Sequence, residues 1–270
     1  MNPTSDPDSK PASQGVVCRR DGSVTRIVLT RPRRHNALGA DDVVHLKALL
    51  DDLAQDDGVR AVIVTGEGET FCSGASLPEM ESGRMSGALF DTLTEKLATL
   101  PLPTIARLNG PVYGGGAELA LCCDFRVGTP GLRLSVPAAR LGVCYPPGGL
   151  GRYVSRLGLG TASRILLAGE ELDADELLRT GYLTHLVPDD GLDARVDALS
   201  KQLGRLAPLA VRNMKRILLH LAAGGGSDGL AARLDPATLA ELVQECADSR
   251  DLKEGLEAWR EGREPDFRGR

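Results

Sequence analysis

The 270-residue sequence contains few aromatic side chains: one Trp, four Tyr and four Phe. Proteins that bind single-stranded nucleic acid stack its bases on clustered aromatic rings, so this composition argues against such a surface. The net charge of −5 also argues against nucleic acid and anionic membranes as main partners. The core must therefore be built mainly from Leu, Val, Ile and Ala, within a hydrophobic fraction of 42%.

Long apolar segments are also missing. No stretch approaches the roughly 18 consecutive apolar residues of a transmembrane helix. Residues 1–15 lack the apolar segment of a secretory signal; they are rich in Pro, Ser and Asp, so we expect a disordered tail there. The six cysteines include no CxxC pair and the four histidines stand apart. We therefore expect free thiols, no metal site and a cytoplasmic protein.

Hydrophobic periodicity divides the rest of the chain into short elements. Residues 24–30 alternate as in a strand, and residues 60–66 form a continuous apolar run, typical of a strand covered on both faces. Apolar residues at helical spacing indicate a helix through residues 43–53. The same patterns predict strands at residues 103–108, 125–128, 133–136 and 182–187. They predict helices at residues 86–100, 117–123, 192–206, 209–223, 235–247 and 251–260.

This order of elements indicates an α/β fold with a helical end. Strands and helices alternate through residues 16–207, which predicts an α/β core. From about Gly149 the chain turns mainly helical, and Gly158, Gly160, Gly169 and Gly181 predict short helices separated by turns. Residues 208–270 form a helical region with a flexible Gly-rich break at residues 224–229.

Two glycine-bearing loops, residues 66–77 and 109–118, each follow a predicted buried strand. Backbone N–H groups at the start of a helix have no partner within the helix, and glycines let a ligand approach them closely. Two such amides from two loops could form an oxyanion hole. Plain tight turns are the alternative, and neither loop matches the nucleotide-phosphate patterns GxGxxG or GxxxxGK[ST].

Glu118 lies just after the three glycines of the second loop, in the predicted first helical turn. An exposed carboxylate there would simply balance the helix dipole. The neighbouring residues Ala117, Leu119, Ala120 and Leu121 are all apolar, however, so we expect partial burial. Burial raises the pKa of a carboxyl group and suits Glu118 to proton transfer.

Five segments in order resemble the crotonase superfamily, that is, the enoyl-CoA hydratases and isomerases. The resemblance covers residues 17–267, which is nearly the whole chain. Each match is weak alone, and the five in order are strong; one of them is Asn109-Gly110 followed by Gly114-Gly115-Gly116-Ala117-Glu118. The matching segments fall within residues 31–38, 71–77, 109–124, 141–149 and 254–267.

The resemblance implies a spiral of ββα units with a C-terminal helical trimerisation region, assembled as a homotrimer or a dimer of trimers. It also implies an acyl-CoA thioester as substrate, with no separate cofactor because coenzyme A is part of the substrate. The thioester oxygen would be held by the amides of Ala75 and Gly115, and Glu118 would transfer a proton. The residues that would surround the substrate in the two loops are Ser73, Gly74, Ser76, Leu77 and Gly114.

The sequence departs from the hydratase pattern at the second catalytic glutamate, where it has Ala138. Alanine cannot transfer a proton, so hydration by two carboxylates at the usual positions is not available. Ser76 stands where the family usually has Asp, a milder change. Tyr145 lies in a run, Leu141-Gly142-Val143-Cys144-Tyr145, that looks like that of acyl-CoA decarboxylases such as methylmalonyl-CoA decarboxylase; a packed loop residue is the alternative.

Coenzyme A needs cations for its phosphates. The resemblance places Arg33 and Arg34 near CoA, and a solvated basic loop is the alternative. It also allows Trp259 and Arg263 to reach the CoA of a neighbouring subunit, although Trp259 could equally be an interface anchor. Three functions stay open: a hydratase or isomerase with one glutamate, an acyl-CoA decarboxylase, and a CoA-thioester-binding homologue without turnover.

Overall fold

The computed structural model describes residues 15–222 and 234–269. Its main sheet has six strands in the order β1-β2-β3-β4-β6-β9. β1 and β2 form an antiparallel hairpin, and the other neighbouring strands are parallel. The strands are β1 (Val16–Asp21), β2 (Val24–Leu29), β3 (Ala61–Gly66), β4 (Thr104–Arg107), β6 (Phe125–Gly128) and β9 (His185–Leu186).

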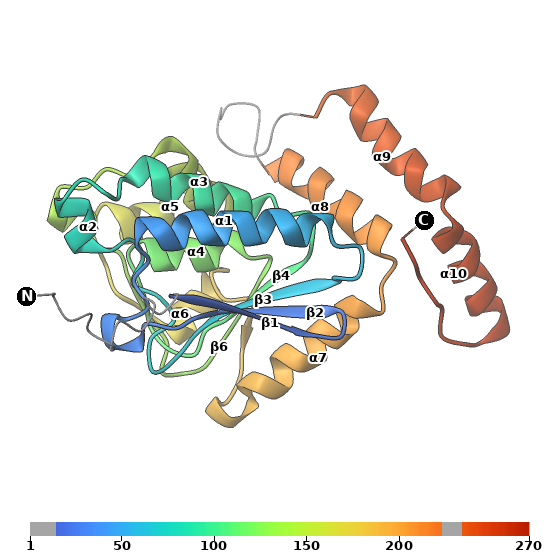
Figure 1. Cartoon of the computed structure of the whole chain (residues 1–270), viewed down its shortest axis with the longest axis horizontal. Coiled ribbons are helices and arrows are strands. Elements are labelled where there is room, and N and C mark those ends of the chain that lie inside the picture. The colour runs from blue at the N-terminus through green and yellow to red at the C-terminus, as the bar shows by residue number, and fades with distance from the viewer. Residues whose placement is uncertain (1–14, 223–233, 270) are drawn as a thin grey trace, which may run out of the picture.

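Helices cover both faces of this sheet (Figure 1). The alternation of β3 shows how: Val62 and Val64 share a core cluster with α1, whereas Ala61 and Ile63 pack with residues of α7. This is why the whole of β3 is buried, as its continuous apolar run predicts. The helices of the body are α1 (Ala40–Gln55), α3 (Gly87–Ala98), α4 (Gly115–Cys122), α5 (Pro147–Leu166) and α7 (Leu192–Gly204).

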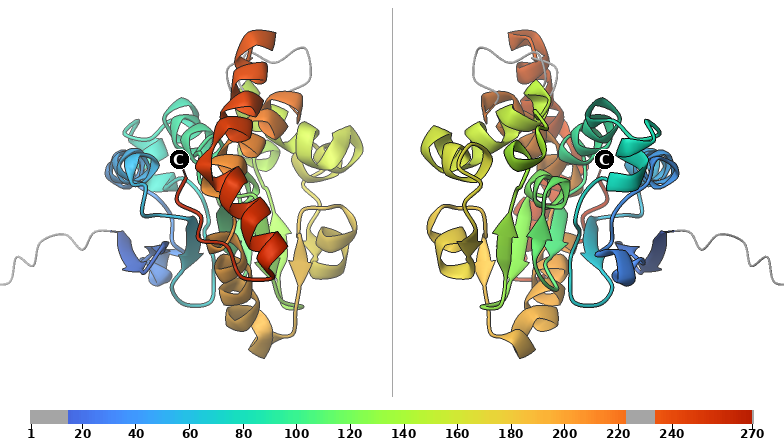
Figure 2. Two further views of the ribbon diagram at one scale, coloured as in Figure 1. Left: turned by 90° about the vertical axis from the view of Figure 1, so that its right-hand side faces the viewer. Right: turned by 90° about the vertical axis from the view of Figure 1, so that its left-hand side faces the viewer.

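A smaller sheet and several short elements complete the body. The second sheet has the order β5-β7-β8, and the chain advances across the molecule from the N-terminal strands to α5 and α6 (Figure 2). The short elements are β5 (Val112–Tyr113), β7 (Arg133–Ser135), β8 (Leu172–Asp173), α2 (Leu77–Glu81), α6 (Ala174–Arg179) and the 3-10 helices η1 (Pro32–Arg34), η2 (Ala139–Leu141) and η3 (Asp189–Gly191).

The structure confirms most of the predicted elements and adds short ones, among them β5, β8 and α2. The sequence reading lacked β1, because Arg19 and Arg20 stand on this exposed edge strand and hide its pattern. As predicted, Gly158 separates helical segments: α5 consists of two of them joined by a kink at Gly158, where φ is +76°. Of the predicted tail, residues 1–14 lie outside the described residues. Gly15 is described and buried, and its carbonyl accepts a hydrogen bond from Thr30 N–H at 3.0 Å.

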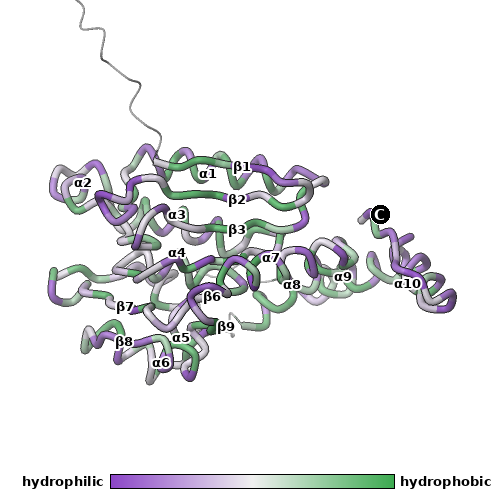
Figure 3. Tube along the Cα trace, turned by 90° about the horizontal axis from the view of Figure 1, so that it is seen from below, coloured by the Kyte–Doolittle hydropathy of each residue, from purple (hydrophilic) through white to green (hydrophobic). Residues whose placement is uncertain are grey.

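Three helices follow the body: α8 (Pro208–Ala222), α9 (Pro236–Asp248) and α10 (Arg250–Glu261). The ammonium group of Lys215 fastens α8 to the body, at 2.7 Å from Asp124 and 2.9 Å from the carbonyl of Leu102. The predicted Gly-rich break at residues 224–229 lies outside the described residues. α9 and α10 project away from the body (Figure 3).

The C-terminal helices leave many apolar side chains uncovered in the single chain. Trp259 is the most exposed, at 82%. On α8 and α10 these residues recur at helical spacing and so form continuous apolar stripes. The exposed residues are Met214, Leu218 and Leu221 of α8, Val243 of α9, and Leu252, Leu256 and Trp259 of α10. None of the helices in the described ranges has the length and apolar character required to cross a bilayer.

Candidate functional site

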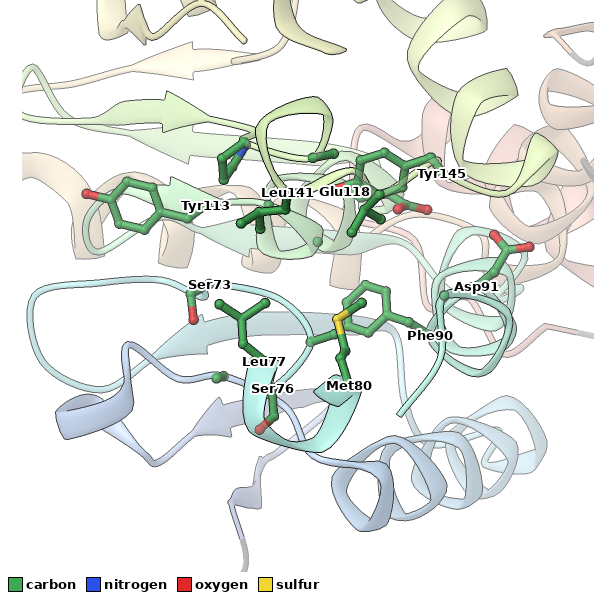
Figure 4. A pocket seen from close by; sticks show the side chains of 18 of the residues that line it. Ser73, Ser76, Leu77, Met80, Phe90, Asp91, Tyr113, Glu118, Leu141 and Tyr145 are labelled. Carbon is green, nitrogen blue, oxygen red and sulfur yellow. The ribbon is translucent and has the colours of Figure 1, made fainter. Parts of the chain in front are cut away.

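A pocket of about 690 Å³ lies between the two glycine-bearing loops (Figure 4). One wall comes from the first loop, α2 and α3, and carries Met80 and Phe90. The facing wall comes from the start of α4 and from the segment of η2 and residues 143–146. Most of the lining side chains are apolar, which suits an acyl chain better than a sugar or a free phosphate.

The two loops touch at Gly74 and Gly115. Gly74 has φ +86°, and a Cβ at this position would lie 2.5 Å from the nitrogen of Gly115. Only glycine satisfies both the left-handed backbone and this close approach. Gly115 itself and Ala75, which follows Gly74, both line the pocket.

The amides of Ala75 and Gly115 are free to bind a ligand. Around Ala75 the neighbouring groups are paired: Leu38 N–H donates to Gly74 O, and Ser76 N–H donates to Leu38 O, both at 2.8 Å. Gly115 is the first residue of α4, so its N–H has no partner within the helix. Neither amide donates to any residue that the structure describes. This is the arrangement that an oxyanion hole requires.

Glu118 lies one turn after Gly115 on α4, as predicted, and lines the same pocket. Its side chain is only 2% exposed. Burial removes water from the carboxylate and raises the pKa of Glu118, although the nearby Arg152 works in the opposite direction. A buried acid with a raised pKa beside two free amides can move a proton to or from a bound thioester.

Arg152 of α5 holds Glu118 in place. Its guanidinium is fully buried, and its Nη2 and Nε donate to Glu118 Oε1 at 2.7 and 3.2 Å. The same group also bonds Glu95 Oε2 at 2.7 Å, Thr94 Oγ1 at 2.7 Å, and Asp91. A buried guanidinium with three carboxylate partners fixes the position of each.

The structure brings most of the predicted site residues together. Gly74 contacts Gly115 but is not itself part of the pocket wall. Ala138 does face the pocket, so the site has a methyl group where the resemblance implies a second glutamate. The predicted residues that line the pocket are Ser73, Ala75, Ser76, Leu77, Gly114, Gly115, Glu118, Ala138 and Tyr145.

Three predicted binding residues lie elsewhere in this chain. Arg33 is exposed on η1 and does not line the pocket, whereas its neighbour Arg34 does. Trp259 and Arg263 belong to the C-terminal region, and Arg263 pairs with Glu254 at 2.6 Å instead of facing the pocket. Their role toward the CoA of a neighbouring subunit stays a prediction.

Sequence reasoning missed Arg152 and Asp91. Arg152 follows the glycines at residues 148–149, but nothing local marks its side chain as buried. Asp91 reads as one polar position of an amphipathic helix, yet it lines the pocket. Both meet Glu118 only because α3, α4 and α5 pack together.

Comparison with known proteins agrees with the motifs. Residues 19–270 match the model of the family described as enoyl-CoA hydratase/isomerase. The 2,3-dehydroadipyl-CoA hydratase of Escherichia coli is 31% identical over 94% of this chain and 99% of its own length. The short-chain-enoyl-CoA hydratase of Clostridium acetobutylicum is 30% identical over 92% and 95% of the two chains.

Solved structures show the same fold. A crystal structure of an enoyl-CoA hydratase from Bacillus anthracis matches with a TM-score of 0.83 at 28% sequence identity, and it covers 95% of this chain and all of the other. The match confirms the crotonase fold and its helical C-terminal region. The chain therefore belongs to the enoyl-CoA hydratase/isomerase family, within the crotonase superfamily that its motifs resemble.

Proposed function

We propose that this protein moves a proton at the α-carbon of an acyl-CoA thioester. The amides of Ala75 and Gly115 bind the thioester oxygen, and Glu118 accepts or returns the α-proton. The observation that carries this proposal is the position of Glu118, buried on the pocket wall one turn after the free amide of Gly115. As the proton leaves the α-carbon, its electron pair moves into the thioester carbonyl, and the two amides stabilise the enolate oxygen.

The surroundings of Glu118 support a substrate with an apolar acyl group. Met80, Phe90, Leu141 and Val143 line the pocket, and Arg34 supplies a cation at its wall. The amphipathic C-terminal helices support assembly of three chains, which would cover the exposed stripes on α8 and α10. The six free cysteines fit the reducing cytoplasm in which we place the protein.

A panel of thioesters tests the proposed reaction. Crotonyl-CoA, a longer 2-enoyl-CoA, a 3-enoyl-CoA and methylmalonyl-CoA are each incubated with the protein, and products are followed by mass spectrometry. We expect turnover of an enoyl-CoA, and Glu118→Gln should reduce it by about 10²–10⁴-fold while binding of the CoA ester remains. Full activity of Glu118→Gln would show that the glutamate has been assigned wrongly.

The oxyanion hole has its own test in a pair of glycines. Gly74→Ala places a methyl group against the amide of Gly115 and should lower kcat by about 10²–10³-fold, the effect of losing one donor. Gly83→Ala is the matched control: Gly83 has a similar φ of +75°, but nothing lies within 4 Å of its Cβ position. If both variants lose activity equally, the loss comes from backbone strain at a positive φ and not from damage to the oxyanion hole.

Thioester binding without turnover is a second candidate. Two observations favour it. Ala138 stands where the resemblance implies a second proton carrier, and Arg152 occupies Oε1 of Glu118, the proton carrier that is present. Tight binding of every thioester in the panel with no product would support this candidate. Loss of carbon dioxide from methylmalonyl-CoA would instead favour a decarboxylase, with Tyr145 on the pocket wall.

A further inference from the structure

The pocket contains a second carboxylate at a position that the motifs do not mark. Asp91 of α3 lines the pocket, and its side chain is 27% exposed, whereas that of Glu118 is 2% exposed. Figure 4 shows the two carboxylates at the same end of the pocket. Solvent can therefore reach Asp91, while Glu118 is shielded from it.

Arg152 joins these two carboxylates at a single atom. Its Nη2 bonds both Asp91 Oδ1 and Glu118 Oε1, so the two oxygen atoms lie on either side of one nitrogen. A third carboxylate, Glu95, bonds Nη1 at 2.7 Å, but Glu95 does not line the pocket. The guanidinium thus fixes the separation of Asp91 and Glu118 within the pocket.

Two consecutive glycines in the first turn of α5 make room for the pair. A Cβ on Gly148 would lie 3.0 Å from Asp91 Oδ1, and a Cβ on Gly149 would lie 3.1 Å from Glu118 Oε1. A Cβ at either position would fit only if the facing carboxylate shifted by a few tenths of an ångström. Both carboxylates therefore sit against the positive end of the same helix, which favours their approach.

The charge balance of the cluster favours one retained proton. Three carboxylates surround one guanidinium, and like charges at such short range resist full ionisation. Besides burial, the negative charge of Asp91 raises the pKa of Glu118. The two pocket carboxylates, Asp91 and Glu118, can therefore share one proton.

We propose that Asp91 replaces the missing second glutamate and activates water for addition to a 2-enoyl thioester. This inference rests on the proposed function of Glu118 and the oxyanion hole. Asp91 accepts a proton from water as the water oxygen bonds to C3 and the C2–C3 π electrons move into the thioester carbonyl. When the enolate collapses, C2 takes the proton of Glu118. Asp91 has gained the proton that Glu118 has lost, so the pair holds one proton before and after the reaction.

Two reactions of the full-length protein separate this role from the proposed function. The first is exchange of the α-protons of butyryl-CoA in D₂O, followed by mass spectrometry, which needs only Glu118 and the oxyanion hole. The second is hydration of crotonyl-CoA, which also needs Asp91. We expect Asp91→Asn to lower hydration by about 10²–10⁴-fold and exchange by less than about tenfold, whereas Glu118→Gln should lower both.

Glu95→Gln is the matched control, because it removes a partner of Arg152 outside the pocket. Its effect measures how much of the loss is transmitted through Arg152. A hydration loss in Asp91→Asn at least about tenfold greater than in Glu95→Gln supports the proposal. Equal losses, or normal hydration in Asp91→Asn, would overturn the role of Asp91. If the wild-type protein does not hydrate crotonyl-CoA, the role of Asp91 is overturned too. If that protein still exchanges the α-protons of butyryl-CoA, the proposed function of Glu118 stands.

Discussion

Arg152 and Arg263 each bind more than one carboxylate, but they do so in different surroundings. Arg152 is fully buried in the body, between Glu118 and two acids of α3. Arg263 lies at the C-terminal end, 40% exposed, where it pairs with Glu254 and Glu261 at 2.6 Å. The same kind of ion pairing therefore occurs once around a fully buried guanidinium and once around an exposed one.

The two clusters move their glutamates in opposite directions. Burial dominates at Glu118 and raises its pKa despite the neighbouring guanidinium. At Glu254 the hydrogen bonds from Arg263 and from the backbone N–H of Asp266 dominate, and they lower the pKa to about 2. The comparison teaches that solvent, more than the identity of the partner, decides whether an ion pair here tunes chemistry or only joins two segments.

The largest effect should come from removing the buried guanidinium. Arg152→Met leaves the carboxylate of Glu118 buried without its partner, which costs about 3–5 kcal/mol in the free energy of unfolding. Denaturant titration at neutral pH measures this loss. Arg263→Met is the control, and its free energy of unfolding should stay close to that of the wild type, because water replaces the exposed partner. Similar losses in both variants would contradict the distinction between the clusters.

The next effect concerns the apolar stripe that α10 presents beside the Arg263 cluster. Leu256 is 53% exposed in the single chain, and we expect a neighbouring subunit to cover it. Leu256→Glu should shift the mass measured by light scattering from an oligomer to a monomer at micromolar concentration. Val44→Glu, at a 62% exposed position of the body, should leave the mass unchanged. A monomeric wild type would show that the stripe is not an interface.

The smallest effect is the pH dependence of stability, which should differ in sign between the clusters. The folded protein holds a proton on Glu118 above the ordinary glutamate pKa of 4.5, so Glu118 contributes a loss of stability as pH rises from 4.5. Glu254 has a lowered pKa, so its contribution is present above pH 4.5 and is lost as pH falls toward 2.

Glutamine variants separate these two windows. Glu118→Gln should remove the decline above pH 4.5, and Glu254→Gln should flatten the decline below it. Unfolding curves collected across both windows for each variant provide the measurement. If Glu118→Gln instead flattens the loss of stability below pH 4.5, or Glu254→Gln the loss above it, the assigned directions of the pKa shifts are wrong.

Much of the fold follows from local sequence patterns. The continuous apolar run of β3 and the alternation in β2 predicted buried strands, because a strand covered on one or two faces needs those patterns. β1 escaped prediction because a hairpin edge tolerates Arg19 and Arg20. The break at Gly158 was predicted, because glycine readily takes the positive φ of +76° at which the two helical segments of α5 meet.

The candidate site divides in the same way. The two glycine loops and Glu118 were visible in the sequence because each depends on neighbours within one loop or one helical turn. Arg33 and Arg34 were both candidates for CoA, and only the structure of η1 decided that Arg34 lines the pocket. Ala138 was recognised as a departure, but its sequence position could not show what stands beside it.

By itself the sequence determined most of the strands, the two glycine-bearing loops, and the carboxylate of Glu118 that follows the second loop. These features depend on backbone freedom and short-range periodicity, which are properties of adjacent residues. Only the tertiary structure decided that Arg152, which is 34 residues from Glu118 and 61 from Asp91, joins the two carboxylates. Such contacts depend on how α3, α4 and α5 rotate and pack against each other, and no local pattern encodes that rotation.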